Sequence, residues 1–408
     1  MDAPVSTLYK GLLLFSRSWE ILKKLHVETY ILIILPILWI LISGFFERPL
    51  FSILLGDKAE LWSRSLFFGG DMLKTGFIIF YLYIYIKLFI WSGQQIRIKV
   101  FKEQLPPTTN MKLFLLSFFY ITIAIFFSSL LVIFTVKQSS LASSPSKMIV
   151  ASELYMKMDM AVFTVDPRLW LIDFFTHTRW DFLLTYVYRK LDWAFALVLI
   201  GLLLFKKTLF RKYLIAFFLA PMIALPFWLA LPAVTPNEMY RNNMFLIPSV
   251  NIIQQQYEKV PLGKNLSKFL DYAEENIENP KQKHPLVSTN PSMHVCWGFL
   301  ITYFAILLWR PLGFIFIPWF ILTFLSTIYT FQHYVIDIPA GIACAIFTIV
   351  LTNYLFKYER KCYIGNYNLL YFLDVFQEDI KQWFWFCFKK FKKSKKMNSE
   401  PSPVADME

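Results

Sequence analysis

Polar and apolar positions along this chain fall into long blocks. Apolar stretches on the scale of a membrane crossing alternate with polar sections that hold most of the Lys, Arg, Asp and Glu residues. From this pattern we predict eight membrane-spanning helices. They cover about Tyr30–Phe46, Thr75–Trp91, Leu113–Val136, Trp193–Phe205, Tyr213–Leu231, Val295–Trp309, Leu312–Phe331 and Ile338–Phe356.

Two long polar sections interrupt the apolar blocks, at Lys137–Asp192 and Pro232–Pro291. The first contains an aromatic-rich stretch around Trp170 and Trp180 that favours a helix at the membrane interface. The chain then divides into three predicted parts. They are an N-terminal two-helix extension with a cytoplasmic loop (1–112), a six-helix core with two long extracytoplasmic loops (113–356) and a basic cytoplasmic tail (357–408).

The composition agrees with this division. The chain has 408 residues, of which 57% are hydrophobic and 17% charged, with a mean hydropathy of +0.48. A soluble domain could not cover so much apolar surface, so we predict an all-α integral membrane protein. The net charge of +13 forms no stripe of Lys and Arg interleaved with stacking aromatic residues, so we do not expect nucleic acid as a partner.

The placement of basic residues predicts the orientation. The N-terminus, the loop at Lys206–Lys212 and the C-terminal tail carry the dense basic clusters, which marks their face as cytoplasmic. Both termini are then cytoplasmic, and the long polar sections face the periplasm or a lumen. The segment from Gln382 to Lys396 reads equally well as an anchor on an anionic lipid surface and as a stop-transfer tail. Lys87, near the end of the second span, is expected to extend to the interface.

The cysteines predict no disulfide framework and no zinc site. The chain has four, Cys296, Cys344, Cys362 and Cys387, and none stands in a CxxC spacing. We expect no metal and no cofactor.

Two short motifs flank the pair of spans that follows the second polar section. They are Asn290 to His294 (NPSMH) and His333 to Asp337 (HYVID). Two membrane crossings return the chain to the face it left, so both motifs lie on one side of the membrane, predicted as extracytoplasmic.

Each motif has a structural reading as well as a chemical one. Asn290, Pro291 and Ser292 suit the start of a helix, and Asp337 suits the cap of another. The same helix start, with its free N–H groups and the Ser292 hydroxyl, also suits phosphate. His333 and Asp337 are four residues apart and would share a face of a helix, so the carboxylate could hold one ring nitrogen and leave the other free to attack phosphorus. A second histidine, His294, could protonate the leaving alkoxide.

These residues resemble the last two motifs of the type-2 phosphatidic-acid phosphatase superfamily, P-S-x-H and S-R-x5-H-x3-D. His333 is seven residues after Ser326, as the pattern requires, while Thr327 stands at the family's arginine position. The resemblance implies a six-helix core and no metal. It also implies that His333 is the nucleophile that forms a phosphohistidine, with Asp337 orienting it, His294 as general acid and base, and Ser292 binding phosphate.

One branch of that superfamily is more similar. Thr327, the H-Y-x-x-D motif and the segment Leu231–Pro236 followed by Tyr240 and Arg241 resemble the inositol phosphorylceramide synthases. The K-x6-R-P motif of the phosphatases is absent from the chain. Arg241 is therefore the candidate phosphate cation. Our predicted substrate-binding set is Ser292, Arg241, Asn290, Thr327 and Tyr334.

The resemblance predicts a membrane lipid phosphotransferase. It would move a phosphorylated headgroup from a glycerophospholipid donor to a lipid hydroxyl such as that of ceramide. A lipid phosphatase with water as acceptor is the alternative, and a non-catalytic membrane protein or lipid transporter is an alternative of another class. Against transport, we see no inverted repeat between the two halves, and Lys87 is almost the only ionisable residue within a predicted span.

Overall fold

The computed structural model describes residues 70–101, 110–119, 145–241, 244, 255, 257–276, 290–362, 374–382 and 385. Three predicted features lie outside these residues: the span Tyr30–Phe46, most of the span Leu113–Val136, and the polybasic end of the tail.

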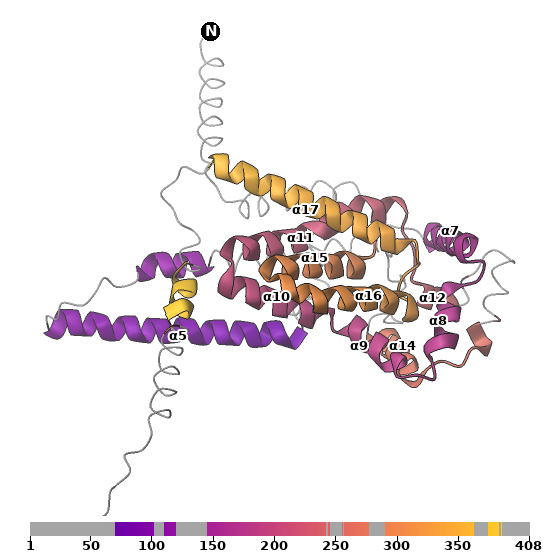
Figure 1. Ribbon diagram of the computed structural model, residues 1–408, viewed down its shortest axis with the longest axis horizontal. Coiled ribbons are helices and arrows are strands. Elements are labelled where there is room, and N and C mark those ends of the chain that lie inside the picture. Colours follow the sequence, from indigo (N-terminus) through magenta and orange to yellow (C-terminus); the bar gives the residue numbers. More distant parts are fainter. Residues whose placement is uncertain are drawn as a thin grey trace, which may run out of the picture.

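Every regular element among the described residues is a helix (Figure 1). The labelled helices are α5 (Gly70–Phe101), α7 (Pro145–Phe163), α8 (Pro167–Phe175), α9 (Trp180–Arg189), α10 (Leu191–Phe205), α11 (Lys207–Ala230), α12 (Pro236–Arg241), α14 (Lys264–Asn276), α15 (Met293–Leu308), the 3-10 turn η1 (Arg310–Leu312), α16 (Gly313–Tyr329) and α17 (Asp337–Cys362), and residues 111–119 and 374–382 are helical as well. The predicted all-helical architecture is confirmed for this part of the chain.

Five helices form a bundle, and they coincide with the fourth to eighth predicted spans. α15 lies at its centre and packs against α10, α11, α16 and α17. This position explains why α15 buries side chains all round, including Val295, Leu300 and Ala305, instead of along one stripe.

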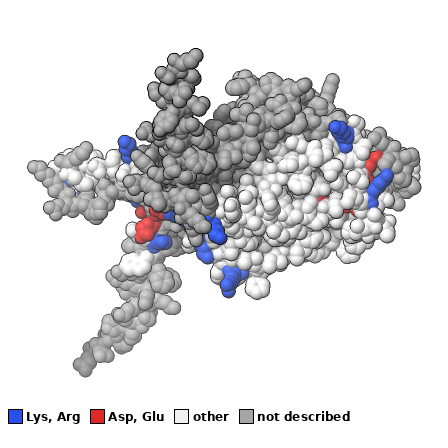
Figure 2. Space-filling model, turned by 90° about the horizontal axis from the view of Figure 1, so that it is seen from above, with Lys and Arg blue, Asp and Glu red and all other residues white. Residues whose placement is uncertain are grey.

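The bundle has the dimensions and the surface of a membrane domain. Three helices are long and apolar enough to cross a bilayer, at Lys207–Ala230, Arg310–Tyr329 and Asp337–Lys357, and α10 and α15 are shorter apolar helices. Large apolar side chains such as Phe314 and Val350 point outward from α16 and α17. Figure 2 shows a described surface that is largely without charged side chains between its two ends. The structure therefore supports a membrane protein, while the number of eight spans stays a prediction.

A second group of helices lies at one end of the bundle, where α16 ends and α17 begins (Figure 1). It consists of α7, α8, α9, α12 and α14, which come from the two long polar sections. A buried carboxylate holds two of them together. Asp181, at the start of α9, accepts the backbone N–H groups of Asn265 and Leu266 in the first turn of α14, at 2.9 and 3.0 Å. It also accepts the hydroxyl of Tyr329 on α16, at 2.9 Å.

At the other end, part of the predicted tail packs as a helix against the bundle. Asp379 accepts the hydroxyl of Tyr83 on α5 at 2.6 Å and pairs with Lys87 at 2.7 Å. Asp374 pairs with Lys207 at the start of α11. Lys87 thus has a carboxylate partner inside the protein, where the sequence predicted a side chain that extends to the interface.

Gly341 allows α17 to approach the start of α15. A Cβ atom at this position would lie 2.7 Å from the backbone oxygen of Ser292 and 3.1 Å from the Cβ of Val295. The backbone oxygen cannot rotate away, so any larger side chain must push the two helices apart.

We predict that Gly341→Ala lowers the stability of the folded protein by about 1–3 kcal/mol, the usual cost of overpacking a close contact. The thermal unfolding midpoint of the detergent-solubilised protein measures it. Gly93→Ala is the matched control, because Gly93 lies within α5 with nothing within 4 Å of its added Cβ. It should keep or raise the midpoint, since Ala favours a helix. Equal midpoints for both variants would contradict the close approach.

Candidate active site

The two sequence motifs meet where α15 and α17 begin. The backbone N–H of Ser292 donates to the carbonyl oxygen of Asp337 at 3.3 Å. The rings of His294 and His333 lie with their centroids 5.8 Å apart. The hairpin of α15 and α16 thus brings together the two histidines that the topology placed on one face.

His333 lies in the loop between α16 and α17, and Asp337 is the first residue of α17. Their contact joins Nδ1 of His333 to Oδ2 of Asp337 at 3.3 Å. The sequence predicts that the two side chains share a face if the chain is helical here, whereas in the structure a turn brings them together. The chemical consequence is the same, since an Nδ1 proton shared with the carboxylate leaves Nε2 with its lone pair.

Asp337 also holds the backbone of this loop. Its Oδ2 accepts the N–H of Tyr334 at 2.9 Å. Two backbone groups at the start of the loop, the N–H groups of Gln332 and His333, donate to the carbonyl of Thr327 at 3.2 Å. His333 is only 7% exposed, and Asp337 is fully buried.

His294 is the second residue of α15 and stacks on an aromatic ring. The ring of Tyr188, on α9, lies nearly parallel to it, with the centroids 4.2 Å apart and an angle of 17°. The Tyr188 hydroxyl is 3.5 Å from Nδ1 of His294. The ring of Phe269, on α14, packs edge-on against the ring of Tyr188, with the two centroids 5.3 Å apart. Burial raises the pKa of Tyr188, so its hydroxyl keeps its proton at neutral pH.

Ser292 is fully buried and caps α15, with its Oγ accepting the N–H of Val295 at 3.4 Å. The side chain of Asn290 lies beside the hydroxyl of Tyr155 on α7. The motif therefore caps α15, as one of the two interpretations predicts, and the first turn of this helix carries His294 toward His333.

The other three predicted substrate-binding residues make contacts within the protein. The Thr327 hydroxyl donates to the carbonyl of Phe324 at 2.7 Å, and the Tyr334 hydroxyl donates to that of Val234 at 2.9 Å. Arg241 pairs with Asp271 at 2.9 Å. The roles in phosphate binding predicted for the whole set stay predictions.

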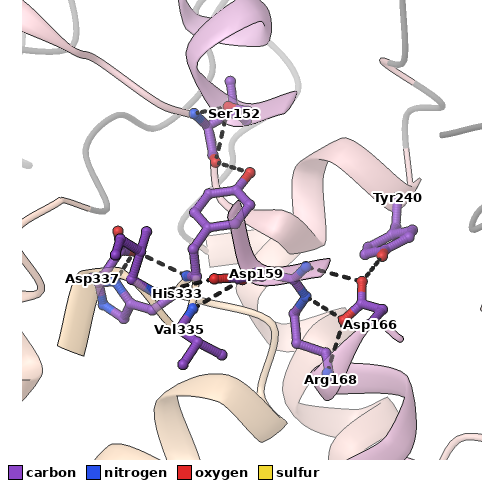
Figure 3. A network of polar contacts seen from close by, with 11 residues as sticks. Ser152, Asp159, Asp166, Arg168, Tyr240, His333, Val335 and Asp337 are labelled. Atoms are coloured by element: carbon purple, nitrogen blue, oxygen red, sulfur yellow. Dashed lines mark hydrogen bonds and ion pairs between the residues drawn. The ribbon is translucent and has the colours of Figure 1, made fainter. Parts of the chain in front are cut away.

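A buried ionic cluster beside the loop was missed by the sequence argument (Figure 3). Arg168, on α8, is fully buried and bonds to Asp166 twice at 2.9 Å and to Asp159 of α7 at 3.1 Å. Its guanidinium lies over the ring of Tyr334, 5.1 Å from the centroid. Asp166 also accepts the hydroxyl of Tyr240.

The cluster follows the rule that buried charges are paired. Burial raises the pKa of Asp159, and the nearby Arg168 offsets part of that rise. Burial acts to lower the pKa of Arg168, but the two carboxylates raise it on balance, so the guanidinium is charged. Of the residues in this cluster, only Asp166 could have been singled out from the sequence. Asp166 followed by Pro167 is a typical helix start, and Asp166 caps α8 by accepting the N–H of Arg168 at 2.8 Å.

Among the described residues, no group of three or more His, Cys, Asp or Glu side chains is arranged to hold a metal ion.

A family model described as the PAP2 superfamily matches residues 153–351. The matched range begins in α7, ends in α17, and contains His294, His333 and Asp337. It confirms the resemblance at the level of the superfamily, whose members are generally phosphatases or phosphotransferases. The inositol phosphorylceramide synthase branch stays a prediction. A search of curated proteins and a search of solved structures each found no match.

We predict that Tyr188 holds His294 mainly through ring stacking. Tyr188→Phe should keep most of the turnover rate, whereas Tyr188→Ala should lose about two- to tenfold, which corresponds to about 0.5–1.5 kcal/mol for an aromatic pair. The rates are measured on protein reconstituted in liposomes. If Tyr188→Phe were as slow as Tyr188→Ala, the hydroxyl contact with Nδ1, and not the stacking, would be the important one.

Proposed function

We propose that this protein is a membrane lipid phosphotransferase that works through a phosphohistidine at His333. It would move a phosphorylated headgroup, such as phosphoinositol, from a glycerophospholipid to a lipid hydroxyl such as that of ceramide. The superfamily match supports a lipid phosphatase or phosphotransferase in general. The transfer to a lipid hydroxyl is our more specific proposal.

One observation carries this proposal: a carboxylate-bound histidine faces a second histidine in a buried site. Asp337 binds Nδ1 of His333, and the ring of His294 lies 5.8 Å away. In this proposal Nε2 of His333 is the nucleophile, and the ring of His294 exchanges a proton with the same phosphoryl group.

The first half of the reaction forms the phosphoenzyme. Nε2 of His333 attacks phosphorus, and the bond between phosphorus and the diacylglycerol oxygen breaks. Burial and the neighbouring His333 lower the pKa of His294 to about 3, so its ring takes up a proton only when the anionic phosphate lies beside it. His294 then gives this proton to the leaving alkoxide, so diacylglycerol departs as an alcohol. Asp337 stabilises the positive charge on the imidazole of His333 as the nitrogen–phosphorus bond forms.

The second half transfers the headgroup. His294, now neutral, takes the proton of the acceptor hydroxyl, and the acceptor oxygen attacks phosphorus. The nitrogen–phosphorus bond breaks, and His333 and His294 return to their starting states. The same steps on a lipid phosphomonoester, with water as acceptor, release inorganic phosphate and give a lipid phosphatase.

The burial of the site supports a lipid acceptor. Ser292, Thr327, Tyr334 and Asp337 are fully buried, and His333 is nearly so. A phosphoenzyme that transfers to an alcohol must be kept from water, and a site with little solvent exposure serves that need. Thr327, at the position where the resembled phosphatases carry arginine, supports the same choice.

The proposed setting follows from the basic clusters of the chain. Both termini are cytoplasmic, and the site faces the periplasm or a lumen, where it meets a phospholipid donor and a lipid acceptor. The basic tail is proposed to rest on anionic lipid at the cytoplasmic surface.

We predict that His333→Ala lowers headgroup transfer by at least about 10³-fold, because removing a nucleophile abolishes the covalent route. His294→Ala should cost about 10²–10⁴-fold, the usual contribution of a general acid. The assay follows labelled headgroup and released phosphate in proteoliposomes that contain donor phospholipid and ceramide. His177→Ala is the matched control, because His177 is exposed in the turn between α8 and α9.

The outcomes separate the three functions. Label that moves to ceramide only with intact His333 supports the transferase. Inorganic phosphate released from a lipid phosphomonoester such as phosphatidic acid, with no label on ceramide, would make the protein a phosphatase. Full activity of His333→Ala would sink the histidine mechanism.

A further inference from the structure

The loop between α16 and α17 presents three successive backbone N–H groups to two carboxylates. Tyr334 donates to Asp337, as described above, and the next two residues donate to a carboxylate from a distant part of the chain. Val335 and Ile336 donate to Oδ2 and Oδ1 of Asp159, at 3.0 and 3.1 Å. Both oxygens of Asp159 thereby bind the segment that links the proposed nucleophile to its carboxylate partner (Figure 3).

Asp159 and Asp166 are chemically alike, since both pair with the guanidinium of Arg168. Their other contacts differ. Asp166 caps α8 and accepts the hydroxyl of Tyr240, whereas Asp159 accepts the N–H groups of the loop. The pair therefore separates two effects, the loss of a buried ion pair and the loss of support for the loop.

Arg168 acts as a counter-ion in this arrangement. Three of its nitrogen atoms bind the two carboxylates, and its flat face lies over Tyr334. It favours the ionised form of Asp159 and so offsets part of the rise in pKa that burial causes.

We propose that Asp159 is a positioning residue for the catalytic loop: its carboxylate fixes the backbone of Val335 and Ile336 and thereby aims the His333 ring. This inference rests on the proposed function for its catalytic effect, and on the loop contacts alone for its structural effect. Residues that do not touch the substrate but hydrogen-bond to the groups that do, as in metal sites, typically contribute about 10–100-fold to activity.

The test compares Asp159→Asn with Asp166→Asn in the full chain. An Asn at 166 keeps the oxygen that caps α8. An Asn at 159 offers one oxygen and one NH₂ group to two N–H donors, so one donor loses its acceptor. Both substitutions remove one negative charge from the same guanidinium. Asp173→Asn, on the exposed face of α8, controls for the loss of a carboxylate as such.

Three quantities are measured for each variant: kcat and KM in proteoliposomes, the thermal unfolding midpoint in detergent, and amide hydrogen exchange of the segment 333–337. Asp159→Asn should lower kcat about 10–100-fold, keep KM within about threefold, and speed exchange in this segment. Asp166→Asn should lower the midpoint to a similar extent, but lower kcat less than about threefold and leave the exchange slow.

Equal loss of kcat and equal exchange in the two variants would overturn the proposal, because the cluster would then act only on stability. If Asp159→Asn yields no folded protein, Asp159→Glu replaces it. Glu keeps the charge opposite Arg168 but displaces the oxygens by one methylene, so kcat should fall in a folded protein. Wild-type kcat in folded Asp159→Glu would also overturn the proposal.

The result for His333→Ala separates this inference from the proposed function. If that variant stays fully active, the histidine mechanism fails, and the hydrogen exchange of Asp159→Asn still decides whether Asp159 holds the loop. If His333→Ala is inactive and Asp159→Asn changes neither rate nor exchange, the function stands and the positioning role is wrong.

Discussion

The site depends on one constraint: backbone N–H groups in the buried and half-buried loop between α16 and α17 must find acceptors. This loop is neither helix nor strand, so its N–H groups have no regular partners, and leaving a buried one unpaired costs about 1–3 kcal/mol. Carboxylates supply the acceptors here, Asp337 for Tyr334 and Asp159 for Val335 and Ile336. These contacts hold the backbone of the segment that directly follows His333.

This constraint explains why the polar sections fold against the end of the bundle. A buried Asp159 needs a counter-ion, which brings in Arg168 and the start of α8. The loop also contains strain, because Phe331 has a φ of 58°, a left-handed conformation that costs about 1–3 kcal/mol for a bulky residue. Aromatic packing holds it, with the rings of Tyr240 and Tyr257 both 5.5 Å from that of Phe331. Helices α7, α8 and α12 therefore support the site in addition to connecting spans.

The sequence predicts the bundle and the motif pair, because each follows from a local property. The bilayer imposes a length on apolar helices, so α11, α16 and α17 are visible as blocks of hydropathy. The meeting of the histidine motifs follows from counting crossings. The Asp159 contacts have no such signal, since they join residues 176 and 177 positions apart and depend on how α7 docks. The same holds for Tyr188 and His294, which are separated by 106 positions.

Because Arg168 is paired with carboxylates, its positive charge is not available to balance the charge of a phosphate group in the site. The resembled phosphatases place an arginine where this chain has Thr327, whose hydroxyl donates to the carbonyl of Phe324. The guanidinium that lies beside the loop is neutralised by Asp159 and Asp166. A phosphomonoester carries about 1.5–2 negative charges at neutral pH, whereas a phosphodiester carries a single charge and needs less cationic compensation. The donor that we propose, an intact glycerophospholipid, is such a diester.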